Sequence, residues 1–149
     1  MTDFQGKPPR TGGLRIRGHH GHRGHPEVKG AMIRFARWLR REYDFPIRVP
    51  VYLSPREQLI TMHGTTAAAT FFAPWDPDVE PYIRIATGDF DEELEGSDRD
   101  EELGSFLLCL AHEVVHYQQW IATGRTTERG VNVRARNMVD RYALTVDHP

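Results

Sequence analysis

The sequence predicts one α+β domain, in which a small antiparallel or mixed sheet of about three strands packs on an N-terminal helix and a C-terminal helical hairpin. A chain of 149 residues is long enough for one hydrophobic core and too short for several domains. Apolar residues recur at helical spacing towards both ends of the chain and alternate with polar residues between them. Hydrophobic residues make up 39% of the chain and charged residues 27%, which excludes collagen, coiled coil and full disorder.

The first 24 residues differ in composition from the rest of the chain. Residues 1–24 are rich in Gly, Arg, Pro and His and have no apolar period, which predicts a flexible basic arm, while residues 25–149 form the domain. The His-rich tract at 19–25 has no carboxylate or cysteine among its histidines, so we interpret it as an adventitious metal-binding surface. Cys109 is the single cysteine and cannot form an internal disulfide, so stability must come from packing or from a metal.

The domain is predicted to begin with an amphipathic helix. Pro26 suits the first turn of a helix, and the pattern ends at a break over residues 44–46. Five apolar residues recur at helical spacing between these points: Val28, Met32, Phe35, Leu39 and Tyr43.

The next predicted element is a half-buried strand. Residues 47–53 alternate between apolar and polar side chains, and Pro50 places this strand at a sheet edge or a bulge. Residues 54–57 resemble a capping box, which predicts a short helix closed by Gly64.

Two further strands are predicted before the C-terminal hairpin. Residues 66–73 and 82–87 are rich in strand-forming side chains and are separated by turn-forming residues at 74–77. The acidic stretch 89–98 is then interpreted as a polar connection.

The C-terminal hairpin is predicted from caps and apolar spacing. Ser97 can cap a long helix that runs to about Thr123, where Gly124 ends it. Thr126 or Thr127 can cap the second helix. Its apolar face contains Val131, Ala135, Met138, Val139 and Tyr142.

Charge is strongly segregated along the chain. Residues 1–41 contain ten Lys or Arg and two acids, a balance of +8, whereas residues 76–102 contain twelve acids and two Arg, a balance of −10. The two segments either face each other or solvent, or residues 1–24 make a weak contact with nucleic acid or an acidic protein.

The motif His112-Glu113-Val114-Val115-His116 is the strongest functional signal. Residues i and i+4 share one helical face, so both imidazoles can point at one metal ion, with Glu113 beside it to accept a proton. Apolar residues at 106–111 precede the motif and predict its burial, and a zinc ion would compensate for a buried carboxylate.

A catalytic zinc ion takes three protein ligands and leaves a fourth position to water, so one ligand must come from outside the motif. The next helix offers Glu128, with Asn132 four residues later to orient the ring N–H of His112 or His116. Asp140 is a second candidate for the third ligand, and Asn132 or a residue outside the hairpin are further alternatives.

The segments LAHEVVHYQQW and TERGVN resemble the zincin metallopeptidases of the Glu-ligand branch, which includes thermolysin and the small ImmA/IrrE-type peptidases. The resemblance covers roughly residues 103–143 and implies a zincin-like fold with Zn²⁺ as cofactor. The site that it implies contains the metal ligands His112, His116 and Glu128, the catalytic Glu113, and Asn132 as an orienting residue.

The resemblance also implies an edge strand that lies along the cleft and pairs with extended substrate. The last predicted strand before the motif is the candidate, with Tyr82, Ile83 and Arg84 as substrate-binding residues. An exposed edge can hold a peptide by backbone hydrogen bonds. The alternative is an internal strand that only packs.

We therefore expect zinc-dependent hydrolysis of peptide bonds in a peptide or protein substrate, with Glu113 as general base. The alternative is a non-catalytic, zinc-stabilised module that binds a protein or nucleic-acid partner through the arm and the acidic segment. No apolar run approaches the ~18 residues of a membrane span, and the N-terminus lacks a secretory signal, so we expect a cytoplasmic protein without a membrane partner.

Overall fold

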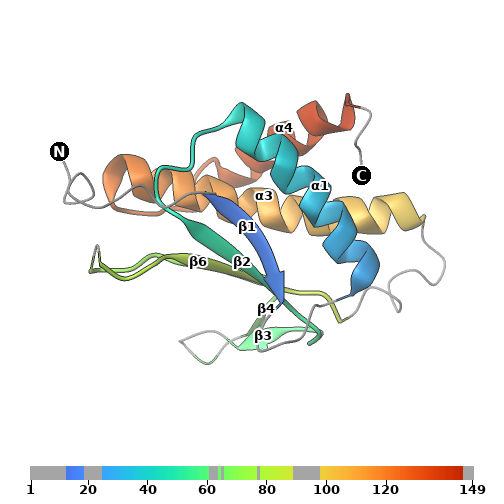
Figure 1. Cartoon of the computed structure of the whole chain (residues 1–149), viewed down its shortest axis with the longest axis horizontal. Coiled ribbons are helices and arrows are strands. Elements are labelled where there is room, and N and C mark those ends of the chain that lie inside the picture. The colour runs from blue at the N-terminus through green and yellow to red at the C-terminus, as the bar shows by residue number, and fades with distance from the viewer. Residues whose placement is uncertain are drawn as a thin grey trace.

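A computed structural model describes residues 13–18, 25–60, 64, 66–76, 78–88 and 98–145, and the structural statements below concern these residues. Three helices and two sheets make up this part of the chain (Figure 1). The helices are α1 (Pro26–Glu42), α3 (Arg99–Thr123) and α4 (Val131–Ala143). The strands are β1 (Leu14–Gly18), β2 (Val49–Ser54), β3 (Leu59–Ile60), β4 (Thr66–Ala67), β5 (Ala69–Phe72) and β6 (Tyr82–Ala86).

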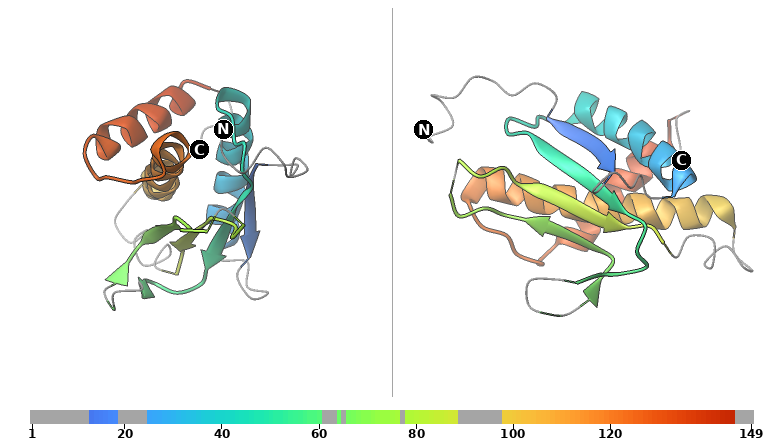
Figure 2. Two further views of the ribbon diagram at one scale, coloured as in Figure 1. Left: turned by 90° about the vertical axis from the view of Figure 1, so that its left-hand side faces the viewer. Right: turned by 60° about the horizontal axis from the view of Figure 1, so that its bottom comes forward.

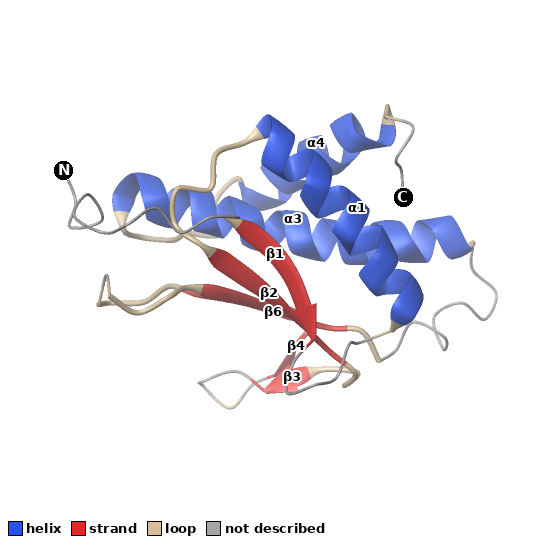
Figure 3. Ribbon diagram, viewed as in Figure 1, coloured by secondary structure: helices blue, strands red, loops and turns tan. Residues whose placement is uncertain are grey.

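The predicted α+β class is confirmed, with a mixed sheet of four strands in place of about three. The strand order is β1-β2-β6-β5, in which β1, β2 and β6 are parallel and β5 is antiparallel to β6. Strands β3 and β4 form a separate antiparallel pair. The helices lie on one side of the four-stranded sheet, and α4 packs on α3 in an outer layer (Figures 2 and 3).

Strand β1 corrects the prediction of a flexible arm at residues 14–18, which pair with β2. Leu14 is fully buried, Ile16 packs against the core, and Arg15 and Arg17 are exposed, so this segment has the period-two alternation of a strand. The surrounding glycines and arginines concealed this short pattern. Helix α1 provides the crossover that allows β1 and β2 to pair in parallel. Residues 1–12 and 19–24 lie outside the described residues.

Strand β2 is internal, so the expectation that Pro50 marks an edge or bulge is wrong. Val49 N donates to Gly13 O at 2.7 Å, and alternation therefore turns the missing donor of Pro50 towards β6. Pairing between β2 and β6 begins only at Val51 opposite Ile83. Pro50 lies one residue before that ladder, where the absent N–H removes no hydrogen bond from it.

The predicted short helix after residue 54 does not form in the described part of the chain; a bend leads directly into β3. Ser54 Oγ accepts from Arg56 N at 3.2 Å, a local bond that competes with helix formation. Gly88 N donates to Arg56 O at 2.8 Å, and a Cβ on Gly88 would lie 2.2 Å from Pro55 O. The close backbone approach at this glycine holds the bend against the chain that leaves β6. The predicted strand at 82–87 is confirmed as β6. The single strand predicted at 66–73 is divided at Ala68 into β4, which pairs with β3, and β5, which pairs with β6.

The helical hairpin is confirmed, with corrections at its caps. Asp98 caps α3 in place of Ser97, because its side chain accepts from Asp100 N at 2.8 Å. Gly124 ends α3 as predicted, with a left-handed φ of 75°. Helix α4 begins only after Gly130, which has no side-chain cap, so the prediction of a Thr126 or Thr127 cap is wrong. In consequence Glu128 lies in the loop between the helices and not on α4.

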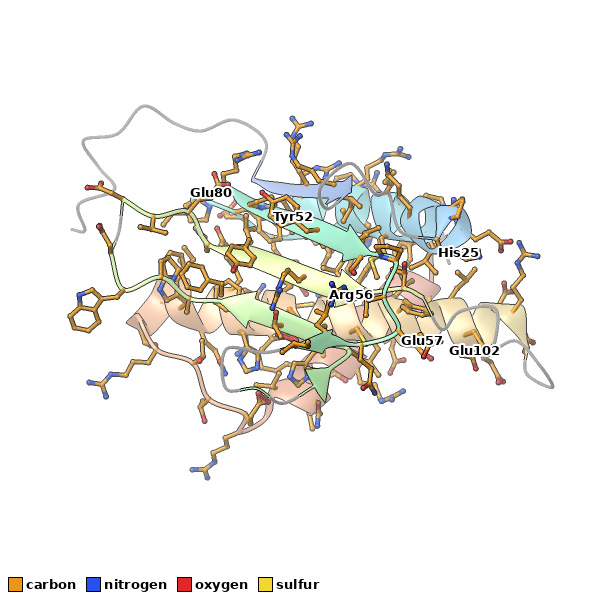
Figure 4. All side chains as sticks on the ribbon, turned by 90° about the horizontal axis from the view of Figure 1, so that it is seen from below. His25, Tyr52, Arg56, Glu57, Glu80 and Glu102 are labelled. Atoms are coloured by element: carbon orange, nitrogen blue, oxygen red, sulfur yellow. The ribbon has the colours of Figure 1, made fainter. Side chains whose placement is uncertain are left out.

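The core lies between the helices and the inner face of the sheet. Tyr117 of α3 is buried there and ties α3 to the chain before β2: its hydroxyl donates to Ile47 O at 2.6 Å and accepts from Ile47 N at 3.1 Å. On the opposite face of the sheet, Tyr52 and Tyr82 have ring centroids 6.0 Å apart (Figure 4 labels Tyr52). None of the described helices has the length and apolar character needed to span a bilayer.

Candidate metal centre

Three potential metal ligands converge where α3 meets the α3–α4 loop. His112 and His116 share one face of α3, and Glu128 reaches them from the loop. Glu128 Oε1 lies 2.8 Å from His116 Nε2, and Glu128 Oε2 lies 3.2 Å from His112 Nε2. The ligand atoms of the three residues all lie within 4.8 Å of one another. The structure therefore places the three predicted ligands together, although Glu128 comes from a loop.

Gln119 positions both His116 and the loop that carries Glu128, and sequence reasoning did not identify it. Its Oε1 lies 3.0 Å from His116 Nδ1 and accepts from Thr127 N at 3.0 Å. Its Nε2 donates to Thr127 O at 3.0 Å, which fixes the orientation of the amide. Gln119 lies three residues after His116, on the same side of the helix, and this i,i+3 spacing was the available signal.

Asn132 lies in the first turn of α4, next to His112. Asn132 Oδ1 is 3.0 Å from His112 Nδ1, so the two predicted residues do meet. Asp140 lies two turns further along α4, is exposed and does not join the ligand group. Cys109 does not join it either, but lines the adjacent cleft.

The hydrogen bond at each Nδ1 determines whether the Nε2 atom of the same ring carries a proton or a lone pair. An amide oxygen faces each Nδ1, so in the neutral imidazoles each Nδ1 carries the proton and donates it to Asn132 or Gln119. Each Nε2 then has a lone pair directed at the Glu128 carboxylate. Two imidazole nitrogens and a carboxylate that converge in this way need protons or a cation between them, and a divalent metal ion is a cation that such groups bind.

Glu113 is buried beside this cluster, with 7% of its surface exposed. Burial raises the pKa of its carboxyl group above the usual value; His112 and His116 oppose the shift, and Glu128 adds to it. A higher pKa makes this carboxylate a better proton acceptor. Its side chain lines the cleft described next, so it can reach a molecule bound there.

A cleft of about 700 Å³ begins at the ligand cluster and runs along α3. Its walls come from α3, from α4, from the first residue of β5 and from Ala68, which joins β4 to β5. The lining residues are Ala68, Ala69, Glu101, Gly104, Ser105, Leu108, Cys109, His112, Glu113, Asn132, Arg136 and Val139.

The prediction that Tyr82, Ile83 and Arg84 form a substrate-binding edge is wrong, because β6 pairs with β2 on one side and β5 on the other. Among the described strands, β5 has the free edge that lies beside the cleft. Ala86 N donates to Ala68 O at 2.9 Å, so the alternate residue Ala69 turns its backbone N–H and C=O away from β6, towards that edge. The sequence analysis assigned the edge to the wrong strand because the alternation of residues within a strand does not indicate the order of strands in a sheet.

Among the other histidines, His25 has a structural position: its Nδ1 accepts from Glu27 N at 3.2 Å and caps α1. His63 lies outside the described residues, as do the other histidines of the His-rich tract, His19, His20 and His22.

No family model, curated protein or solved structure matches this chain.

Proposed function

We propose that this chain is a zinc-dependent peptidase with a zincin-like active site, in which His112, His116 and Glu128 hold the metal. One observation supports the proposal above the others. The Nε2 atoms of two imidazoles converge with a carboxylate, and the Nδ1 atoms of the same two rings face the side-chain oxygens of Asn132 and Gln119. Metal-binding histidines in proteins have this arrangement, in which the second ring nitrogen donates to an oxygen that fixes the ring.

The ligand set favours a catalytic zinc site over a purely structural one. It comprises two nitrogens and one carboxylate, and structural zinc sites take four protein ligands, often cysteines. Glu128 is exposed over 74% of its side chain, which leaves a path for water and substrate. A zinc ion bound there would lower the pKa of a coordinated water towards 7 and polarise a carbonyl group.

The chain's own residues would then supply proton transfer and substrate alignment. Glu113 takes a proton from the attacking water as the water oxygen bonds to the carbonyl carbon. It delivers that proton to the amine nitrogen as the C–N bond breaks. The free edge of β5 at Ala69 aligns an extended peptide along the cleft by backbone hydrogen bonds.

The proposal is tested with purified protein in which His19, His20 and His22 are replaced by alanine, so that the His-rich tract binds no adventitious metal. We expect about one tightly bound zinc per chain. After chelation and reconstitution, we expect a peptide library to be cleaved only by the zinc-loaded form, with fragments identified by mass spectrometry. Less than stoichiometric zinc, or cleavage that persists without metal, contradicts the proposal. Stoichiometric zinc without cleavage supports the non-catalytic module.

Gln119→Ala is expected to weaken zinc binding about 10- to 100-fold, because residues that orient metal ligands contribute on that scale. The variant loses the acceptor at His116 Nδ1 and both hydrogen bonds to Thr127. Affinity is measured by competition with a chromophoric chelator. Gln118→Ala is the matched control, since Gln118 accepts from Arg134 at 2.9 Å and has no hydrogen bond to either histidine within the described part of the chain. Equal zinc affinities in the two variants would show that Gln119 does not position the metal ligands.

A further inference from the structure

The cleft beside the ligand cluster is built from stripes on two antiparallel helices. On α4, the lining residues Asn132, Arg136 and Val139 are spaced by four and three residues and so share one face. The chain reverses between α3 and α4 (Figure 1), so residues beyond Asn132 lie along earlier turns of α3. Arg136 is therefore about one helical turn, or about 6 Å, along the cleft from Asn132, the residue that contacts His112.

Arg136 lines the cleft, is exposed and has no hydrogen bond or ion pair within the described part of the chain. The other exposed charged residue of the lining, Glu101, lies eleven residues before His112, or about 16 Å along α3. No ion pair joins Glu101 to Arg136 in the structure described. The surrounding wall is largely apolar, with Leu108 and Val139 among its residues, and an apolar wall strengthens the field of a charge beside it.

An unpaired arginine in such a cleft is suited to a carboxylate, because its planar fork can donate two parallel hydrogen bonds to the two oxygens. An extended peptide advances about 3.3 Å per residue, so the roughly 6 Å from Asn132, which lies beside the proposed ligand His112, to Arg136 corresponds to about two residues. We propose that Arg136 selects peptide substrates that carry a carboxylate about two residues from the scissile bond. This inference rests on the proposed peptidase function. An Asp or Glu side chain and a free C-terminus both supply the required group.

The test uses the zinc-loaded protein and a set of peptides with one parent sequence. In one pair the peptides carry Asp or Asn at the second residue before the scissile bond, and in another pair at the second residue after it. In a further pair the chain ends at the second residue after the scissile bond, either as a free acid or as an amide. We expect kcat/KM to be about tenfold higher for the carboxylate member of one pair. The pair that shows the preference distinguishes a side-chain carboxylate from a C-terminal one.

Two substitutions at Arg136 assign the preference to this residue. Arg136→Gln is expected to abolish it, and Arg136→Glu to reverse it in favour of a peptide with Lys at that position. Arg134→Gln removes the same charge two residues away, outside the cleft lining, and is expected to keep the preference. Binding of the same peptides to zinc-loaded Glu113→Gln protein, followed by fluorescence anisotropy, gives a readout that does not depend on cleavage.

The outcomes separate this inference from the proposed function. Cleavage with no carboxylate preference, or with a preference that survives Arg136→Gln, overturns the role of Arg136 and leaves the peptidase intact. Binding of the acidic peptide that depends on Arg136, without cleavage by the wild type, overturns the peptidase and retains the carboxylate site. Absence of both cleavage and binding overturns both.

Discussion

His112→Ala is expected to lower zinc affinity by at least about a hundredfold, because it removes one of the three ligands. Loss of a residue that only orients a ligand already lowers metal affinity by about 10- to 100-fold. It also removes the stabilisation that zinc binding gives to the fold. For the wild type, zinc at a hundred times its Kd stabilises the native state by about 2.7 kcal/mol, which raises Tm by roughly 5–10 °C in a chain of this size. Calorimetry with and without zinc measures the difference.

The matched control for this variant is Asp140→Ala. Asp140 is exposed on α4 and lies outside the ligand group, so its replacement is expected to leave both zinc affinity and the zinc-dependent rise in Tm unchanged. Glu128→Ala is expected to behave like His112→Ala. If Asp140→Ala loses zinc while Glu128→Ala retains it, the assignment of the third ligand is wrong.

Glu113→Gln is expected to retain one zinc per chain and to reduce kcat by about 10²- to 10⁴-fold, the range for loss of a general base. Glutamine has nearly the same shape as glutamate, but its amide does not accept a proton at neutral pH. The Glu113 side chain is not among the three converging ligands, so the metal site keeps its donors. Single-turnover cleavage assays and zinc analysis of the same preparation separate the two effects.

Glu102→Gln serves as the control for the change of charge. Glu102 lies in the first turn of the same helix and does not line the cleft. We expect its replacement to leave kcat and KM at the wild-type values. Loss of zinc from Glu113→Gln would show that this carboxylate holds the metal, and unchanged kcat would exclude it as the base.

The sequence predicted α1, α3 and the meeting of His112 with His116 because each depends on local periodicity. Two residues four apart on a helix share a face wherever that helix packs. The end of α3 at Gly124 is also local, since only the conformation of that residue is involved. For the same reason the HExxH motif could be placed correctly before any tertiary contact was known.

Strand order was not predictable in this way. β1 was missed because five residues of alternation lie within a glycine- and arginine-rich segment, and β6 was assigned to an edge that β5 occupies. Hydrogen bonds between strands join residues far apart in the chain, and the pattern within one strand does not state which neighbour it takes.

The sequence by itself determined which groups lie side by side on one helix: two imidazoles on one helical face and a carboxylate beside them, with Glu128, Asp140 and Asn132 all open as candidates for a third ligand. Only the tertiary structure decided how Glu128 reaches the imidazoles, which is from a loop held by Gln119, and which strand edge borders the cleft. The physical reason is one of range. Helical geometry repeats every 3.6 residues and can be read along the chain, whereas loop docking and sheet order depend on contacts that form only when distant segments pack together.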